Sequence, residues 1–185
     1  RTSAFKSGKM KGRYIVTNVV LALTRTKNPK LDYGHIRAAL SGITGIPAES
    51  LESSDALTPQ VVRDAVISIR RSKLPDVEQI GSAGSFFKNP VVEEEVFRKI
   101  QEANADVPHY VTEGGIKIPA AWLIEQCGWK GRTQGNAGVY EKQPLVIVNA
   151  TGSASPGEII DLKNDITASV KERFGITLEP EVEII

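Results

Sequence analysis

The segment formed by residues 81–90, with the sequence GSAGSFFKNP, constrains the fold of this chain more than any other. Two glycines and a closing proline oppose a continuous helix, because glycine loses much conformational freedom in a helix and proline lacks the backbone N–H. The sequence therefore predicts a loop over residues 76–90, which separates the helical patterns on either side. Its small side chains also allow the backbone to pass close to a ligand.

Helical patterns lie before and after this loop. Thr58 followed by Pro59 predicts the start of a helix that ends near Arg71, with apolar residues at helical spacing. Residues 155–158 (SPGE) form a capping box with proline in the first turn and predict a helix that ends at Gly175. Two further helices are predicted over residues 91–104 and 119–127.

Strand patterns complete an α+β reading. Residues 13–24 (RYIVTNVVLALT) are rich in β-branched side chains and predict a strand. Short strands are also predicted over residues 116–118 and 145–148, and an irregular glycine-rich stretch over residues 131–138. At the end of the chain Glu179, Glu181 and Glu183 alternate with Val182 and Ile184, so the acidic side chains are expected on one face. The fold class is predicted as α+β, with few strands and three main helices.

Composition excludes several classes of function. The net charge is +1, from 23 basic and 22 acidic residues, which does not indicate a partner such as nucleic acid or a membrane surface. Cys127 is the single cysteine, so no intramolecular disulfide is expected and a reducing cytoplasm is predicted. With only His35 and His109 beside it, no zinc site is expected. No membrane span or signal peptide is predicted, and because the chain opens at Arg1 without methionine we expect a piece of a longer protein.

Within residues 81–90, Ser85 is the candidate for a catalytic side chain. A serine nucleophile requires a histidine or lysine base, and the nucleophile-elbow pattern is absent because Phe87 stands at the place of its second glycine. A hydroxyl in a partly closed pocket can still donate a proton. The alternative is a structural turn that packs Phe86 and Phe87 into the core, and the residues alone leave both readings open.

The same stretch, extended to GSAGSFFKNPVV, resembles the signature of the UDP-N-acetylenolpyruvoylglucosamine reductases. Further blocks resemble this family in the same order along nearly the whole chain. These are residues 1–6 (RTSAFK), 31–34 (LDYG), 70–75 (RRSKLP), 119–131 (PAAWLIEQCGWKG) and 178–182 (LEPEV). Ordered blocks of this kind are far more specific than one short motif.

The resemblance implies an enzyme of peptidoglycan precursor synthesis, acting in cell-wall biogenesis, cell shape and cell division. NADPH reduces bound FAD, and the flavin passes hydride to the vinyl group of UDP-N-acetylglucosamine enolpyruvate to give UDP-N-acetylmuramate. Ser85 matches the family's proton donor, Arg1 its arginine for the substrate carboxylate, and Glu181 its glutamate, which helps to stabilise the intermediate. Without the resemblance, Glu181 would be read as part of a solvated strand face and Arg1 as a frayed terminus.

Nucleotide binding is implied at four further positions. Tyr33 matches the family's mobile tyrosine, which closes over the substrate diphosphate. Lys73, Asn89 and Gln143 match its diphosphate and nucleotide contacts, and lysine, amide and phenol donors suit a diphosphate. Taken alone, Lys73 and Gln143 would be read as plain surface residues.

The family layout implies that residues 1–74 complete the second flavin-binding domain, 75–175 form the substrate-binding domain and 176–185 return toward the flavin-binding region. Nothing in the chain resembles the family's phosphate-cradling turns, and no Gly-x-Gly-x-x-Gly or Walker pattern occurs. We therefore expect the chain alone to bind FAD poorly and to be inactive, and we expect no obligate protein partner. A non-catalytic sugar-nucleotide binding module and a purely structural domain remain alternatives.

Overall fold

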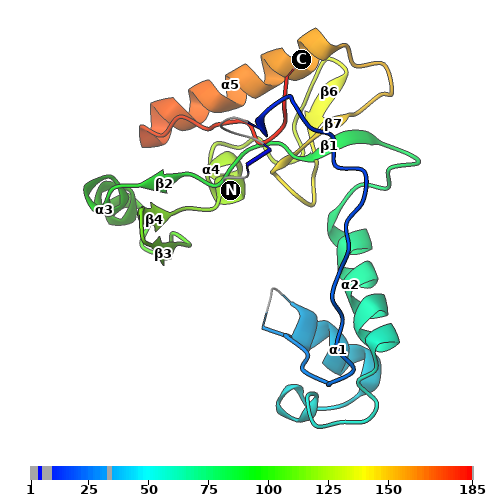
Figure 1. Cartoon of the computed structure of the whole chain (residues 1–185). Helices are drawn as coiled ribbons and strands as arrows, with labels where there is room; N and C mark the ends of the chain where they lie inside the picture. The colour runs from blue at the N-terminus through cyan, green and yellow to red at the C-terminus, as the bar shows by residue number, and fades with distance from the viewer. Residues whose placement is uncertain (1–3, 6–9, 33–34, 185) are drawn as a thin grey trace.

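The computed structural model describes residues 4–5, 10–32 and 35–184. Its helical N-terminal region is connected by the long helix α2 to a C-terminal region that contains both helices and sheets (Figure 1). The helices are α1 (Ile36–Thr44), the 3-10 turn η2 (Ala48–Ser50), α2 (Pro59–Lys73), α3 (Glu94–Ala103), α4 (Ala120–Gln126) and α5 (Pro156–Phe174). The strands are β1 (Gly81–Ser85), β2 (Val91–Val92), β3 (Tyr110–Thr112), β4 (Gly115–Lys117), β5 (Thr133–Gln134), β6 (Ala137–Val139) and β7 (Val146–Asn149). The α+β fold class is confirmed.

Two antiparallel sheets organise the C-terminal region. The larger has the strand order β1-β7-β6-β5, and the smaller has the order β2-β4-β3. β7 begins with three buried apolar residues and ends at the polar Asn149, and the three buried residues are as expected for a strand covered on both sides. β1 lies at an edge of the larger sheet, with β7 on one side.

The main core of the C-terminal region lies where α4 and α5 pack against the larger sheet. From α5, Leu162, Ile166 and Val170 are fully buried along one stripe. They meet side chains of α4 and of β6 and β7, among them Leu123, Ile124, Ala137, Val139 and Ile147. The helix and the two strands are in contact along this layer, so one amphipathic helix closes the sheet.

A capping box fixes the start of α5. The Ser155 hydroxyl accepts from the Glu158 backbone N–H at 3.2 Å, and the Glu158 carboxylate accepts from the Ser155 backbone N–H at 2.8 Å. The same carboxylate accepts from the backbone and side-chain N–H groups of Asn136, in the turn between β5 and β6. These hydrogen bonds, first of all that from the Ser155 backbone, lower the pKa of Glu158 to about 2. The predicted capping box is thus confirmed, and it also joins the helix to the sheet.

The N-terminal region has a second, smaller core. Its buried side chains come from α1, α2 and the loops around them, namely Leu31, Leu40, Leu51, Leu57 and Ala65. Thr58 caps α2 as predicted, since its hydroxyl accepts from the Val61 backbone N–H at 3.2 Å. The helix runs two residues beyond the predicted end at Arg71, to Lys73.

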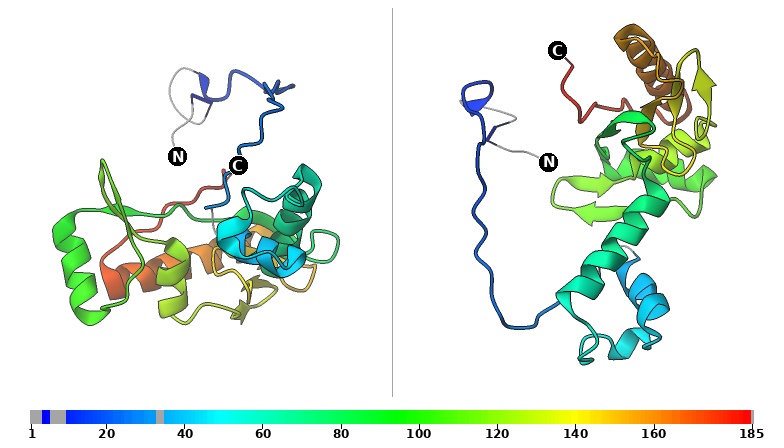
Figure 2. Two further views of the ribbon diagram at one scale, coloured as in Figure 1. Left: turned by 90° about the horizontal axis from the view of Figure 1, so that it is seen from below. Right: turned by 90° about the vertical axis from the view of Figure 1, so that its right-hand side faces the viewer.

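The prediction of a strand over residues 13–24 is wrong for the described structure. Residues 14–24 form no helix or strand, and the apolar side chains there are exposed, including Ile15 at 90% and Val20 at 94%. Figure 2 shows this part of the chain running apart from both regions over most of its length. β-Branched residues favour a strand only where a partner strand accepts their hydrogen bonds, and the described residues provide none here.

Other corrections concern glycine-rich or short elements. Part of the predicted 76–90 loop is β1, and the predicted helix over residues 91–104 begins only at Glu94, after β2. The stretch 131–138 contains β5 and the start of β6 rather than irregular chain. The predicted acidic face after residue 178 is only partly formed, because the segment makes an isolated bridge at Pro180 instead of a strand. Except for β5, which pairs with the neighbouring β6, these elements are decided by pairing with a distant segment, which local composition does not reveal.

Candidate functional site

Ser85 lies at the end of β1, immediately after a β-bulge. Ser82 pairs with Val148 and Ser85 with Val146, so that Ala83 and Gly84 stand opposite the single residue Ile147. Gly84 has φ +76°, a left-handed conformation that favours glycine. Bulges re-aim side chains and are common beside active sites. Ser85 is exposed at the edge of the sheet, where its hydroxyl makes no hydrogen bond to the other described residues.

Phe86 joins the Ser85 segment to two distant parts of the chain. Its backbone N–H donates to the carbonyl oxygen of Leu145 at 2.7 Å, and its own carbonyl oxygen accepts from the Glu181 backbone N–H at 2.7 Å. Phe87 forms the isolated bridge with Pro180. The chain therefore brings Ser85 and Glu181 to the same edge of the molecule, although they are far apart in sequence. Glu181 is half-buried there.

The two phenylalanines after Ser85 are also part of the core. Phe86 and Phe87 are 5% and 3% exposed, and their rings pack with centroids 5.4 Å apart. The alternative of a structural turn is therefore confirmed only in the inward packing of the two aromatic side chains, because residues 81–85 form a strand. The aromatic anchors fix the backbone on which Ser85 stands, so the two readings are compatible.

Gln143 lies in the turn between β6 and β7. Its backbone carbonyl accepts from the Val146 N–H at 3.0 Å, and its backbone N–H donates to Tyr140 at 3.2 Å. Leu145 follows two residues later and is the acceptor of the Phe86 N–H. The turn that carries Gln143 is therefore adjacent to the Ser85 strand, on the side of β7.

Asn89 lies on the other side of the phenylalanines, and its side chain has a structural partner. The Asn89 Oδ1 atom accepts from the backbone N–H of Ala120, the first residue of α4, at 2.9 Å. This bond satisfies one of the unpaired N–H groups of the helix start. The side chain is held by one end and exposed, so its amide NH₂ is directed by the helix rather than free to rotate.

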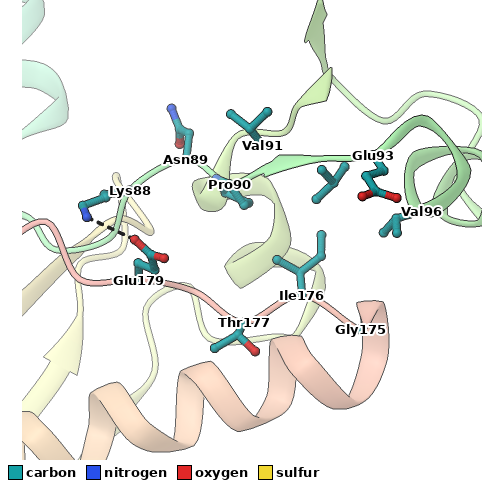
Figure 3. Close-up of a pocket in the computed structure, with 11 residues that line it drawn as sticks. Lys88, Asn89, Pro90, Val91, Glu93, Val96, Gly175, Ile176, Thr177 and Glu179 are labelled. Carbon is teal, nitrogen blue, oxygen red and sulfur yellow. Dashed lines mark hydrogen bonds and ion pairs between the residues drawn. The ribbon is translucent and has the colours of Figure 1, made fainter. Parts of the chain in front are cut away.

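A groove lies beside Asn89, between the chain that leads into β2 and the chain that follows α5 (Figure 3). It has a volume of about 460 Å³, and apolar side chains such as Val92, Val96 and Ile176 line it. At one end the Lys88 ammonium donates to the Glu179 carboxylate, with Nζ and Oε2 3.1 Å apart. No motif in the sequence predicts this ion pair, although its two residues lie in the segments 81–92 and 178–182 that resemble the family.

Lys73 stands apart from the groove, as the exposed last residue of α2. A second hollow, of about 570 Å³, lies between the end of this helix and β1. Arg70, Arg71, Gly84 and Val146 contribute to its lining. Lys73 is one turn from these arginines but does not itself line the hollow. The two consecutive arginines are the residues near β1 that the sequence analysis left without a role.

Two predicted site residues, Arg1 and Tyr33, lie outside the described residues. Among the others, the structure gathers Ser85, Asn89 and Glu181 and the turn of Gln143 around residues 86–88, while Lys73 lies at the end of α2 and lines neither of the two hollows. Within the described ranges no three His, Cys, Asp or Glu side chains are grouped so as to hold a metal ion. None of the helices described there is long and apolar enough to cross a membrane.

Comparison with known proteins gives a consistent result. The family model for "UDP-N-acetylenolpyruvoylglucosamine reductase, C-terminal domain" matches residues 75–185. A UDP-N-acetylenolpyruvoylglucosamine reductase of Pseudomonas putida is 45% identical over 184 residues, which is 98% of this chain and 50% of that protein. Proteins of the same name from Bacteroides fragilis and Xanthomonas euvesicatoria are 41% and 43% identical over the full chain, with 52% and 50% of their lengths covered. The chain thus spans about half the length of the curated relatives it matches.

Proposed function

Because the chain belongs to the family of UDP-N-acetylenolpyruvoylglucosamine reductases, we propose that it supplies the substrate side of an enzyme that makes UDP-N-acetylmuramate. The substrate is UDP-N-acetylglucosamine enolpyruvate, the reductant is NADPH acting through FAD, and the product enters peptidoglycan synthesis in the cytoplasm. Residues 75–175 form the substrate-binding domain in this proposal. Residues 1–74 and 176–185 belong with the flavin-binding part.

The observation that carries the proposal is the convergence at Phe86. Its carbonyl oxygen holds the Glu181 backbone, and its neighbour Ser85 follows the bulge at Gly84. A hydroxyl and a carboxyl group that are 96 positions apart in the sequence thus reach one edge of the fold. Reduction of an enol ether next to a carboxylate requires an acid at one carbon and stabilisation of the negative charge that develops on the carboxylate side.

Ser85 acts as the acid in this proposal. Its O–H bond breaks as the proton goes to the carbon that bears the carboxylate, after hydride has been added to the terminal vinyl carbon. Solvent returns a proton to Oγ, which an exposed hydroxyl permits. Glu181, as a protonated carboxyl group, donates a hydrogen bond to the developing enolate, and Arg1 pairs with the substrate carboxylate.

The nucleotide occupies the surface around Asn89 in this proposal. The Asn89 side chain is already oriented by its bond to the start of α4, so less rotamer freedom is lost when its NH₂ group donates to a ligand. Gln143, in the adjacent turn, offers a second amide. Lys73 supplies a mobile point charge, and Tyr33 closes over the diphosphate.

A flavin would supply the hydride. The described residues leave room for its ring beside β1 but offer no comparable site for the rest of the cofactor. β1 is exposed along its length, and no described atom beyond Gly84 and its two chain neighbours lies within 4 Å of a Cβ placed on Gly84, so a flat ring can come close to the backbone there. Within the described part of the chain, the pyrophosphate has no comparable binding site. The start of α5 is flanked by Gly152 and Gly157, but its own Glu158 carboxylate already occupies that end. This supports the expectation that the chain alone binds FAD poorly.

Ser85→Ala in the complete protein tests the assignment. We expect substrate reduction to slow by about 10²–10⁴-fold, the usual cost of losing a general acid, while NADPH still reduces the flavin at the original rate. Stopped-flow absorbance separates these two half-reactions. Ser82→Ala is a matched control, since Ser82 is an exposed serine on the same strand.

Two outcomes would contradict the proposal in different ways. If flavin reoxidation by the substrate keeps its original speed in Ser85→Ala, Ser85 is not the proton donor. If the complete protein binds UDP-N-acetylglucosamine but never oxidises NADPH in the presence of the enolpyruvyl substrate, the chain belongs to a binding module instead.

A further inference from the structure

The C-terminal segment formed by residues 179–183 carries Glu181 between two ion-paired carboxylates. Glu179 pairs with Lys88 at 3.1 Å, and Glu183 pairs with Lys11 at 3.4 Å. Both lysines come from segments far away in the sequence. The carboxylate that the proposed function uses is therefore flanked by two charged attachments of the same backbone.

Lys88 is attached to this segment twice. Its backbone N–H donates to the carbonyl oxygen of Glu179 at 2.9 Å, and its ammonium donates to the carboxylate of the same residue at 3.1 Å. Figure 3 shows this ion pair at the end of the groove. Beyond the Phe87–Pro180 bridge, the Glu181 N–H donates to Phe86.

The backbone contacts of this segment are few. Pro180 has no N–H, so the bridge leaves one hydrogen bond on each side of it, from Lys88 to Glu179 and from Glu181 to Phe86. Up to residue 184, where the described chain ends, no regular ladder continues past this point, since the bridge is isolated. A side-chain attachment next to such a short contact changes how long the contact stays formed, because local opening breaks only a small number of bonds.

We propose that Lys88 is a positioning residue, which acts through its ion pair with Glu179 to hold Glu181 beside Ser85. The inference rests on the proposed function, since it gives Glu181 its role. An exposed ion pair adds little to global stability, and these side chains are 40% and 73% exposed. Its effect is therefore on the placement of residues 179–181 rather than on the folding of the domain.

The test is Lys88→Met in the complete protein, because methionine keeps the length of the side chain and removes its charge. We expect flavin reoxidation by the substrate to slow about twofold to fivefold, the range for an exposed ion pair, with flavin reduction by NADPH unchanged. Hydrogen exchange at the Glu181 amide should become faster by a similar factor. Lys130→Met is the matched control: its ion pair with Glu125 has a lysine 41% exposed, and we expect neither quantity to change.

Charge exchange separates positioning from a general loss of structure. Lys88→Glu combined with Glu179→Lys restores the pair with opposite polarity, and we expect most of the lost rate to return, whereas either change alone remains slow. Unchanged reoxidation in Lys88→Met, or no recovery in the exchanged pair, would overturn the inference. Ser85→Ala and Glu181→Gln are measured alongside. If they too leave reoxidation unchanged, the proposed function itself fails, whereas slow reoxidation in these two with an unaffected Lys88→Met removes only the role of Lys88.

Discussion

The C-terminal and N-terminal regions differ in the size of their buried cores. In the C-terminal region, buried side chains come from α3, α4, α5, the larger sheet and the final segment, and partly buried side chains of the smaller sheet pack against them. Among the described residues of the N-terminal region, the buried cluster consists of a few leucines and one alanine around α1 and α2. The C-terminal region can therefore be stabilised by its own packing, while the N-terminal region has little apolar burial to offset its conformational entropy.

The exposed segment before α1 makes this difference larger. Its apolar residues, among them Tyr14, Val16 and Leu21, would be core residues in an ordinary strand. A series of exposed apolar side chains is typical of a surface that contacts something else. The C-terminal region thus holds most of the buried apolar side chains of the described residues, whereas the N-terminal region leaves many of its own exposed.

Leu162→Ala should have the largest effect on this comparison. Leu162 is fully buried between α5 and the larger sheet, so we expect a loss of about 2–5 kcal/mol in the free energy of unfolding of the C-terminal region. Both tryptophans, Trp122 and Trp129, lie in this region, and their fluorescence during urea unfolding reports on it alone.

Leu40→Ala is the matched variant, since Leu40 is equally buried but in the smaller core. We expect it to leave the tryptophan transition in place and to reduce the helical circular dichroism of α1 and α2. An equal shift of the tryptophan transition in both variants would show that the two regions unfold as one unit, and the comparison would then fail.

Acid should lower the free energy of unfolding of the C-terminal region by a smaller amount than Leu162→Ala does. The folded-state pKa of Glu158 is about 2, below its ordinary value of 4.5, so its contribution is complete above about pH 4.5 and is lost as the pH falls toward 2. We expect Glu158→Gln to be less stable than the original chain above pH 4.5 and to approach it near pH 2. Urea unfolding at a series of pH values measures this. A difference that stays constant over the whole range would mean that the carboxylate charge contributes nothing.

Val20→Ser should have the smallest effect. Val20 is 94% exposed, so we expect a change within about 0.5 kcal/mol in the free energy of unfolding of the chain. Val146→Ser, at a fully buried position of β7, is the contrasting variant and should be strongly destabilising. A large loss from Val20→Ser would show that residues 14–24 pack against the rest of the chain.

The helices could be predicted from the sequence because their signals are local. The capping box at Ser155 and Glu158 and the N-cap at Thr58 both form as predicted, since each depends on residues three positions apart. α1 has no side-chain cap at His35 and was not predicted. The apolar face of α1 is stabilised by packing against Leu51 and Ala65, which lie elsewhere in the chain, so the local sequence does not predict this helix.

The site was predicted less completely, and for a physical reason. The chain resembles its family at Ser85, Asn89 and Glu181, so these positions could be named, but the arrangement around Phe86 could not. It depends on the carbonyl of Leu145 and the N–H of Glu181, and backbone groups are the same for every residue type. β1 was not predicted, because its five small residues show no alternation of apolar side chains. The roles assigned to Ser85, Asn89 and Glu181 in binding and catalysis remain predictions.

The bulge at Ala83 and Gly84 makes the length of β1 matter more than its composition. Successive side chains in a strand point to opposite faces, so removal of one of the two bulged residues would regularise the pairing with Ile147 and turn the Ser85 hydroxyl by half a period. Substitutions at positions 81–83 should be tolerated far more readily than any single-residue insertion or deletion there. Over evolutionary time the residue types in this strand are thus expected to vary, while the number of its residues stays constant.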